Sequence, residues 1–173
     1  MPKKFRLLLV DANVVIHAHA AGFWSQLLDC CDIHLSETVV GECLFYEDTE
    51  GIRHDIDLQP AIGKGNISVH AVSVKDLQAF RAHFGTLYQQ KLDDGEMESL
   101  AILFGSNEGW LIASADKIVF RILGSANRGE QGVSLEEILQ KTGLARSLPK
   151  MFSKDYRDQW TRKGFEENLY GLS

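Results

Sequence analysis

The chain has 173 residues, of which 45% are hydrophobic and 24% are charged. This composition is typical of a globular protein with a buried core, and it excludes a disordered chain, a collagen-like repeat and a coiled coil. The formal net charge of −6 argues against a surface that is basic throughout and coats nucleic-acid phosphates.

Apolar runs of strand length alternate with segments of helical periodicity over the first 142 residues. The predicted strands are 5–10, 33–36, 67–74 and 110–113. The predicted helices are 14–28 (single, or broken near Gly22), 36–45, 75–88, 93–104, 116–123 and 135–141. This alternation predicts a three-layer α/β/α fold with a mainly parallel central sheet. The acidic stretch 47–66 contains Gly and Pro and is predicted to be an inserted loop or hairpin.

A C-terminal tail follows this α/β body. Pro149 marks the change, and we expect one domain over 1–145 and a helical tail over 146–173 that docks on it. Apolar side chains recur every four residues in the tail, which would place them on one face of a helix. These residues are Leu148, Phe152, Tyr156 and Trp160.

The tail also differs from the body in charge. From Lys141 to Ser173 there are seven basic and four acidic residues, whereas the first 140 residues carry a net charge of −9. Docking on the body is the interpretation that we favour, because apolar helical stripes usually face a core. The alternative is a helix that binds a partner protein, or a nucleic-acid contact in which basic residues alternate with aromatic rings.

The sequence predicts a cytoplasmic protein that is not embedded in a membrane. No apolar run approaches the roughly 20 residues that span a bilayer. The apolar stretch near the N-terminus ends at Asp11, which breaks the pattern of a signal peptide. The cysteines are odd in number, which favours a reducing compartment, and we expect Cys30, Cys31 and Cys43 to be small core residues.

Two acidic residues follow predicted strands. Asp11 comes directly after the first strand and Asp116 shortly after the fourth. Ligands bind at the carboxyl ends of strands in open parallel sheets. Glu42 and Glu96 lie in predicted helices that could aim their carboxylates at the same crevice. Carboxylates brought together repel one another and therefore hold either protons or a divalent cation. An all-oxygen site suits Mg²⁺ or Mn²⁺.

Each of these acids also has a structural interpretation. Asp11 and Asp116 could cap the helices that follow them. Asp93 and Glu96 have the spacing of a capping box, in which each side chain accepts a hydrogen bond from the other residue's backbone N–H. Glu42 could be a solvated helical side chain. The hypothesis of a metal site therefore rests on the combination of the acids and not on any one of them.

Four segments of the chain occur in the order and rough spacing of the PIN-domain ribonucleases: LLLVDANVVI, SETVVGEC, LDDGEMESLAIL and WLIASADKI. The chain resembles this family over roughly residues 5–142, which would make 1–145 a PIN-like nuclease domain. PIN domains are compact α/β metal-dependent nucleases, and many are toxins of type II toxin–antitoxin pairs. The insertion 47–66 and the tail lie outside the pattern, and a further acid found in some members would fall near Ile118.

The resemblance implies a catalytic set of four acids, namely Asp11, Glu42, Glu96 and Asp116. Of these, Asp11, Glu96 and Asp116 would hold Mg²⁺ or Mn²⁺. Asn13 and Ser114 would hold the carboxylates or a phosphate oxygen by hydrogen bonds. The implied reaction is hydrolysis of RNA phosphodiester bonds by an activated water.

Other assignments and functions stay open. Asp93, Asp94 or Glu98 could replace Glu96 as a metal ligand, since all are close to it in the sequence. The implied partners are an RNA substrate, an antitoxin or another protein, and a second copy of the chain. One alternative function is a catalytically silent PIN-like module that binds RNA or a protein. Another is a phosphotransfer or phosphohydrolase domain that uses Asp11, although Asn13 replaces the second acid which that chemistry expects.

Overall fold

The computed structural model describes residues 3 and 5–171, so the outer ends of the predicted segments 1–145 and 146–173 lie outside the described residues. The strands are β1 (Phe5–Val10), β2 (Cys31–Ser36), β3 (Phe45–Glu47), β4 (Arg53–Asp55), β5 (Ile67–His70), β6 (Leu111–Ala113) and β7 (Gly132–Val133). The α-helices are α1 (Ala12–Ala20), α2 (Trp24–Cys30), α3 (Glu37–Glu42), α4 (Gln59–Gly63), α5 (Val74–Arg81), α6 (Thr86–Gln89), α7 (Asp94–Phe104), α8 (Lys117–Ser125), α9 (Leu135–Thr142) and α10 (Lys154–Leu169). Two 3-10 helices are η1 (Gly129–Gln131) and η2 (Lys150–Phe152). None of the helices in the described part of the chain is long and apolar enough to cross a membrane.

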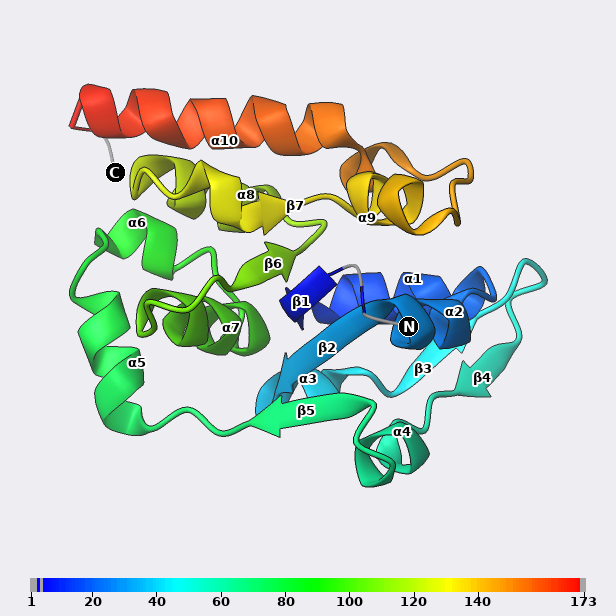
Figure 1. The fold of residues 1–173 in the computed structure, drawn as a ribbon. Helices are drawn as coiled ribbons and strands as arrows, with labels where there is room; N and C mark the ends of the chain where they lie inside the picture. Colours follow the sequence, from blue (N-terminus) through cyan, green and yellow to red (C-terminus); the bar gives the residue numbers. More distant parts are fainter. Residues whose placement is uncertain (1–2, 4, 172–173) are drawn as a thin grey trace.

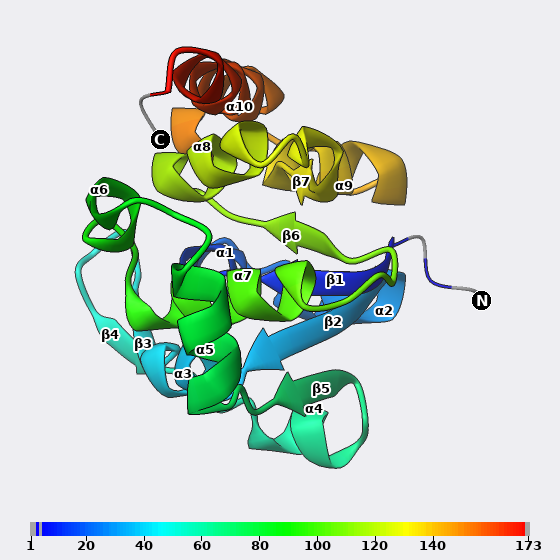
Figure 2. The ribbon, with the colours of Figure 1, turned by 90° about the vertical axis from the view of Figure 1, so that its left-hand side faces the viewer.

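Five parallel strands form the central sheet in the order β5-β2-β1-β6-β7. The chain builds the sheet from β1 through β2 to β5, and then crosses back to place β6 on the other side of β1. Helices cover both faces of the sheet, which confirms the predicted three-layer α/β/α fold (Figure 1, Figure 2). The boundary between β1 and β6 is the switch point at which the strand order reverses.

Successive side chains of β1 pack on opposite faces of the sheet. Leu8 and Val10 belong to a core that includes side chains of α1, α2 and α9. Leu9 belongs to a second core, formed with α5, α7 and α8. This alternation is the period of two that a strand imposes on its side chains. The apolar run that predicts this strand therefore reflects burial on both faces of a parallel sheet.

Several predicted helices differ in extent from the observed ones. Of the two alternatives for 14–28, the broken helix is the correct one: α1 and α2 are separated at Gly22, which has a φ of +76°. The helix predicted over 36–45 ends at Glu42, because the chain then enters the short strand β3. The helix predicted over 75–88 is broken between α5 and α6. Strand β7 was not predicted, since two residues carry no readable periodicity.

The insertion 47–66 contributes a hairpin and one short helix. Strands β3 and β4 pair in antiparallel register outside the main sheet, and α4 follows them. The hairpin therefore extends the molecule beside the sheet without adding a strand to it.

The three cysteines are free. Cys31 and Cys43 are buried in the core, as predicted, whereas Cys30 is half-buried against it.

The C-terminal tail is helical, as predicted, and α10 packs along α8 (Figure 1, Figure 2). The prediction that four aromatic and apolar residues share one helical face is wrong. Leu148 and Phe152 precede α10, which begins only after Ser153. The Ser153 hydroxyl caps the helix by accepting a hydrogen bond from the Tyr156 N–H at 3.2 Å. Tyr156 and Trp160 lie half-buried in the first half of α10.

Two glycines allow the backbones of α8 and α10 to touch. A Cβ added at Gly164 would overlap the backbone carbonyl of Arg121, and one added at Gly124 would overlap that of Thr161. The close approach also buries an ion pair, in which Arg121 Nη2 lies 2.8 Å from Glu167 Oε1. The Tyr88 hydroxyl of α6 donates a hydrogen bond to the same carboxylate. The tail is thereby fixed to the body by backbone packing and by a buried charge pair.

Replacement of Gly164 by Ala should lower the free energy of unfolding by about 1–3 kcal/mol, because the added methyl group must push α10 away from α8. Urea denaturation followed by circular dichroism measures this change. Gly41→Ala is the matched control, since a Cβ at this helical position meets no atom within 4 Å. Equal stability of Gly164→Ala and the wild type would show that the helices are not in this close contact.

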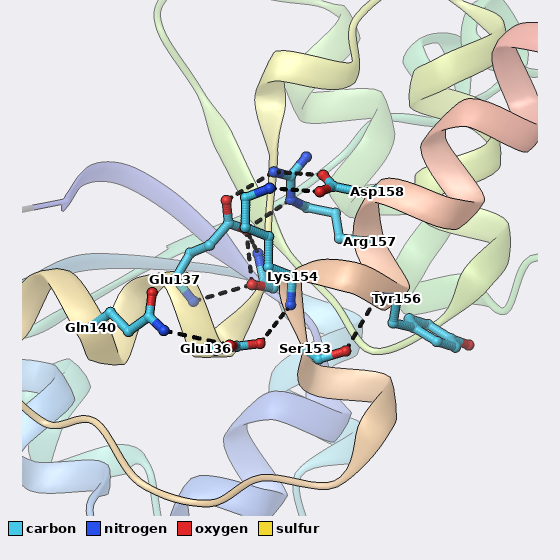
Figure 3. Close-up of polar contacts among 9 residues, drawn as sticks. Glu136, Glu137, Gln140, Ser153, Lys154, Tyr156, Arg157 and Asp158 are labelled. Carbon is cyan, nitrogen blue, oxygen red and sulfur yellow. Dashed lines mark hydrogen bonds and ion pairs between the residues drawn. The ribbon is translucent and has the colours of Figure 1, made fainter.

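A polar network ties the start of α10 to α9 (Figure 3). Arg157 donates two hydrogen bonds to the Glu137 carboxylate, at 2.7 and 2.8 Å. The backbone N–H of Lys154 donates to Glu136 Oε2 at 2.7 Å. The Arg157–Glu137 pair is bidentate and largely shielded from solvent, so it contributes more than an exposed ion pair does. Tyr156 points away from this network in Figure 3.

Candidate active site

The carboxyl ends of β1 and β6 lie side by side at the switch point of the sheet. Val10 and Ala113 are partners in register, and the Asp11 N–H donates to the Ala113 carbonyl at 2.9 Å. Asp11 and Ser114, which follow the two strands, therefore meet although they are 103 residues apart in the sequence. This edge of the sheet is the place where open α/β folds bind their ligands.

Asp11 is buried and directed toward β6. Only 2% of the residue is exposed, and its side chain makes no capping hydrogen bond to α1. Instead the Ser114 hydroxyl donates to Asp11 Oδ2 at 3.1 Å. Burial, and next the charge of Asp93, raise the pKa of Asp11 to about 7, although the bond from Ser114 acts in the opposite direction. Asp11 thus occupies the N-cap position of α1 without the side-chain hydrogen bond of a cap.

Glu96 is the most perturbed acid of this cluster, and it too is only 2% exposed. Burial, followed by the charges of Asp11, Asp116 and Asp93, raises its pKa to about 9. Its Oε2 accepts the Asp93 N–H at 3.1 Å, which completes the predicted capping box of α7. Its Oε1 is buried and has no hydrogen-bond partner among the described residues. One carboxylate therefore serves both as a helix cap and as an unpaired acid.

Asp116 joins the cluster through the loop between β6 and α8. Its Oδ1 accepts the Ile118 N–H at 3.0 Å, so the predicted helix cap is present. Its own N–H donates to the Ser114 hydroxyl at 3.0 Å. Ser114 thus links the two acids at the strand ends, because the same hydroxyl donates to Asp11. The charge of Asp116 raises the pKa of both Asp11 and Glu96.

Glu42 lies half-buried at the end of α3, against the first turn of α7. A Cβ on Gly95 would overlap its Oε2, so the glycine leaves the space that this carboxylate occupies. Burial, and then the charges of Asp93 and neighbouring acids, raise the pKa of Glu42, while a hydrogen bond from the Gly95 backbone acts in the opposite direction. Glu42 therefore belongs to the same electrostatic cluster, at a more open position than Glu96.

The remaining candidates are less well placed as ligands. Asp93 and Asp94 are exposed, although the charge of Asp93 raises the pKa values of Asp11, Glu42 and Glu96. Glu98 is turned toward α3, where its Oε2 accepts the Thr38 N–H at 3.3 Å. Asn13 is exposed in the first turn of α1. Among the acids near the start of α7, Glu96 is thus the one whose carboxylate is buried with Asp11 and Asp116.

A divalent cation needs several oxygens that converge on one point. As the side chains lie, no group of three His, Cys, Asp or Glu residues within residues 3 and 5–171 is placed to hold a metal ion. Glu96 and Asp116 each use one oxygen to cap a helix, which restrains their carboxylates. The donor set itself suits Mg²⁺ or Mn²⁺, because it is all oxygen, mutually repulsive and includes the unpaired Glu96 Oε1. Cation binding requires these carboxylates to turn toward one another.

Two features of the site had no usable signal in the sequence. Gly95 was part of a motif, but its role in making room for Glu42 depends on the packing of α3 against α7. Tyr156 and Trp160 pack on the body, as predicted. No pattern in the sequence, however, indicated that Trp160 would lie against Lys117, the residue after Asp116. Both features arise from contacts between distant segments.

Comparisons of the chain with models of protein families, with curated proteins and with solved structures find no match. The resemblance to PIN-domain ribonucleases therefore stays a prediction from the four motifs. What the chain itself provides is a cluster of carboxylates at the switch point of a parallel sheet.

Proposed function

We propose that the chain is a metal-dependent ribonuclease of the PIN-like kind, which hydrolyses RNA phosphodiester bonds at Asp11, Glu96 and Asp116. The observation that carries the proposal is the buried acid Glu96, whose pKa is raised to about 9 next to two further acids at the strand ends. Strongly perturbed acids in a crevice are typical of functional sites. A cluster of this kind is neutralised either by protons or by a divalent cation.

Each residue has a distinct role in the proposed reaction. Mg²⁺ or Mn²⁺, when bound, would supply the positive charge that activates water and stabilises the displaced phosphate oxygen. Asp11, Glu96 and Asp116 would hold this ion. Ser114 positions Asp11 relative to Asp116, because its hydroxyl is hydrogen-bonded to both residues. Glu42, at the more open edge of the cluster, would accept the proton of the attacking water.

Supporting contacts are proposed for the RNA as well. Asn13, exposed next to Asp11, would donate a hydrogen bond to a phosphate oxygen. A toxin role, an antitoxin or other protein partner and a homodimer stay predictions from the resemblance. They concern surfaces of the chain and do not affect the chemistry of the cluster.

Calorimetric titration with Mn²⁺ tests the proposal without any guess about the RNA sequence. We expect one site in the wild type and release of about one to two protons per ion at pH 7, because Asp11 and Glu96 must ionise to bind. Proton release is measured by repeating the titration in buffers of different ionisation enthalpy. Asp11→Asn and Asp116→Asn should abolish binding, and Asp29→Asn, an exposed acid of α2, should not.

Two outcomes would contradict the proposal. Absence of Mn²⁺ binding to the wild type would favour the catalytically silent module that binds RNA or a protein. Binding that is retained in both Asp11→Asn and Asp116→Asn would place the ion elsewhere on the chain. In either case the perturbed acids would be a structural feature of the switch point.

A further inference from the structure

The start of α10 brings two aromatic rings beside the acid cluster. Lys117, the residue that follows Asp116, begins α8, and the Tyr156 and Trp160 rings of α10 pack against the core to which α8 contributes. The Lys117 ammonium lies 5.2 Å from the centre of the Trp160 ring. The Tyr156 and Trp160 ring centres are 6.2 Å apart, with an angle of 64° between the planes. The two rings and the lysine thus form one surface that adjoins the cluster.

This surface is accessible and carries basic side chains. Tyr156 and Trp160 are half-buried, so part of each ring faces solvent. A hollow of about 390 Å³ on α10 is lined by Trp160 together with Arg162 and Lys163. Within the described part of the chain, Lys117, Arg162 and Lys163 form no ion pair, whereas other basic residues of the tail do (Figure 3). Positive charge is therefore available here, next to the carboxylates of an otherwise acidic body.

The surface is also held rigidly. The close backbone contacts at Gly124 and Gly164 and the Arg121–Glu167 pair fix α10 along α8. The network between α9 and α10 fixes the start of the helix (Figure 3). Contacts from Lys117 to Trp160 and from Arg121 to Glu167 follow the same order along both helices, so α8 and α10 both start next to the cluster. A prepositioned surface loses little conformational entropy when it binds a ligand.

Aromatic rings interleaved with unpaired basic side chains are the chemistry that binds single-stranded nucleic acid. Bases stack on the rings, and the basic groups follow the phosphates. The bases of an A-form duplex are stacked on one another inside the helix, and double-stranded RNA is bound mainly through its shape and backbone. A stacking surface therefore favours an unpaired strand. A strand lying on Tyr156 and Trp160 would continue directly to the acids that the proposed reaction uses.

We infer that Tyr156, Trp160 and Lys117 form a substrate-binding wall of the site, on which an unpaired RNA strand lies. Two bases stack on the rings, while Lys117 and Lys163 contact the phosphates. The inference rests on the proposed ribonuclease function, since it names residues that hold the RNA at this site. It assigns the C-terminal tail, which lies outside the family pattern, to substrate binding.

Fluorescence anisotropy with a labelled, unstructured 12-nucleotide RNA in EDTA tests the inference, because no metal-dependent cleavage occurs there. Trp160→Ala should weaken binding by about 5- to 150-fold, given that stacking of one base is worth about 1–3 kcal/mol. Trp160→Phe should restore most of it. Tyr170→Ala is the matched control. This aromatic residue is 77% exposed and follows the C-terminal end of α10, whereas Tyr156 and Trp160 lie near its start. A duplex of the same sequence should compete at least tenfold less well.

Three results would overturn the inference: no RNA binding by the wild type, equal binding of the duplex, or unchanged binding by Trp160→Ala that melts like the wild type. Failure of the ribonuclease proposal looks different. If RNA binds through Trp160 but Mn²⁺ produces no cleavage, the substrate-binding wall is supported and the ribonuclease proposal is contradicted. If Mn²⁺ supports cleavage and Trp160→Ala binds and cleaves as the wild type does, the substrate-binding wall is contradicted and the ribonuclease proposal is supported.

Discussion

An Asp11→Asn variant should cleave RNA at least about 100-fold more slowly than the wild type in Mn²⁺, since loss of even a residue that supports a metal ligand costs 10–100-fold. The substitution keeps the size of the side chain and an oxygen that can accept the Ser114 hydroxyl, and it removes the negative charge. The measurement is the cleavage rate of a single-stranded RNA under conditions in which each enzyme molecule turns over once.

The controls for this experiment separate chemistry from folding and from RNA binding. Asp29→Asn, which changes an exposed acid of α2, should cleave at the rate of the wild type. Asp11→Asn should bind RNA in EDTA at least as well as the wild type, because a negative charge next to the phosphates is lost. Full cleavage by Asp11→Asn would remove this residue from the reaction and with it the proposed site.

Without divalent cations, the protein should lose stability as the pH rises from about 4 to 9. In the unfolded chain the Asp11 and Glu96 carboxyls ionise near their ordinary values of 3.8 and 4.5, whereas in the folded chain their pKa values are about 7 and about 9. The folded state therefore binds more protons over this range, so rising pH favours unfolding. Asp11 alone contributes a loss on the order of 4 kcal/mol by pH 9.

Glu96→Gln should reverse much of this loss. The glutamine keeps an oxygen that can accept the Asp93 N–H, and it carries no charge next to Asp11, Asp116 and Asp93. We expect the variant to melt roughly 10 °C above the wild type at pH 8 in EDTA, and at nearly the same temperature at pH 4. Thermal denaturation at a series of pH values measures both quantities.

Two comparisons make this prediction specific. Glu108→Gln, in an exposed loop, should follow the pH dependence of the wild type. Millimolar Mn²⁺ should raise the melting temperature of the wild type at pH 8 more than that of Glu96→Gln, because ligand that binds only the folded state stabilises it. A wild-type stability that is flat or rises between pH 5 and 9 would show that these acids are not buried as carboxyls.

The strands and most helices were predictable because they are encoded by neighbouring residues, through apolar runs, helical periodicity and capping side chains. The run that becomes β1 is apolar at successive positions since both faces are buried, and Ser36 is found as the cap of α3. The breaks at β3 and between α5 and α6 were missed, because they depend on where the chain must turn to reach the next packed segment. Helical periodicity continues through such breaks and gives no warning of them.

The sequence was sufficient to identify the acids of the site, but it could not decide whether each of them caps a helix or binds a metal ion. Asp11 follows a strand buried on both faces, and in the structure it stands at the N-cap of α1 without a capping hydrogen bond from its side chain. For Glu96 the two interpretations turn out to be compatible, since one oxygen caps the helix while the other is buried without a partner. The place of Trp160 against Lys117, the residue after Asp116, depends on the close approach of α8 and α10 at Gly124 and Gly164, which no pattern in the tail could indicate.

The hydrogen bond from Ser114 to Asp11 joins residues 103 positions apart, across the crossover from β5 to β6. During synthesis, β1, β2 and β5 emerge long before β6. The chain can therefore pair three of the five strands of its sheet before the site is assembled. Contacts of such long sequence separation form late, because the entropy of closing the intervening chain must first be overcome. The raised pKa of Glu96 is consequently a marker of completed folding. A truncated or newly made chain that lacks β6 would carry the same acids with ordinary titration behaviour and no assembled cluster.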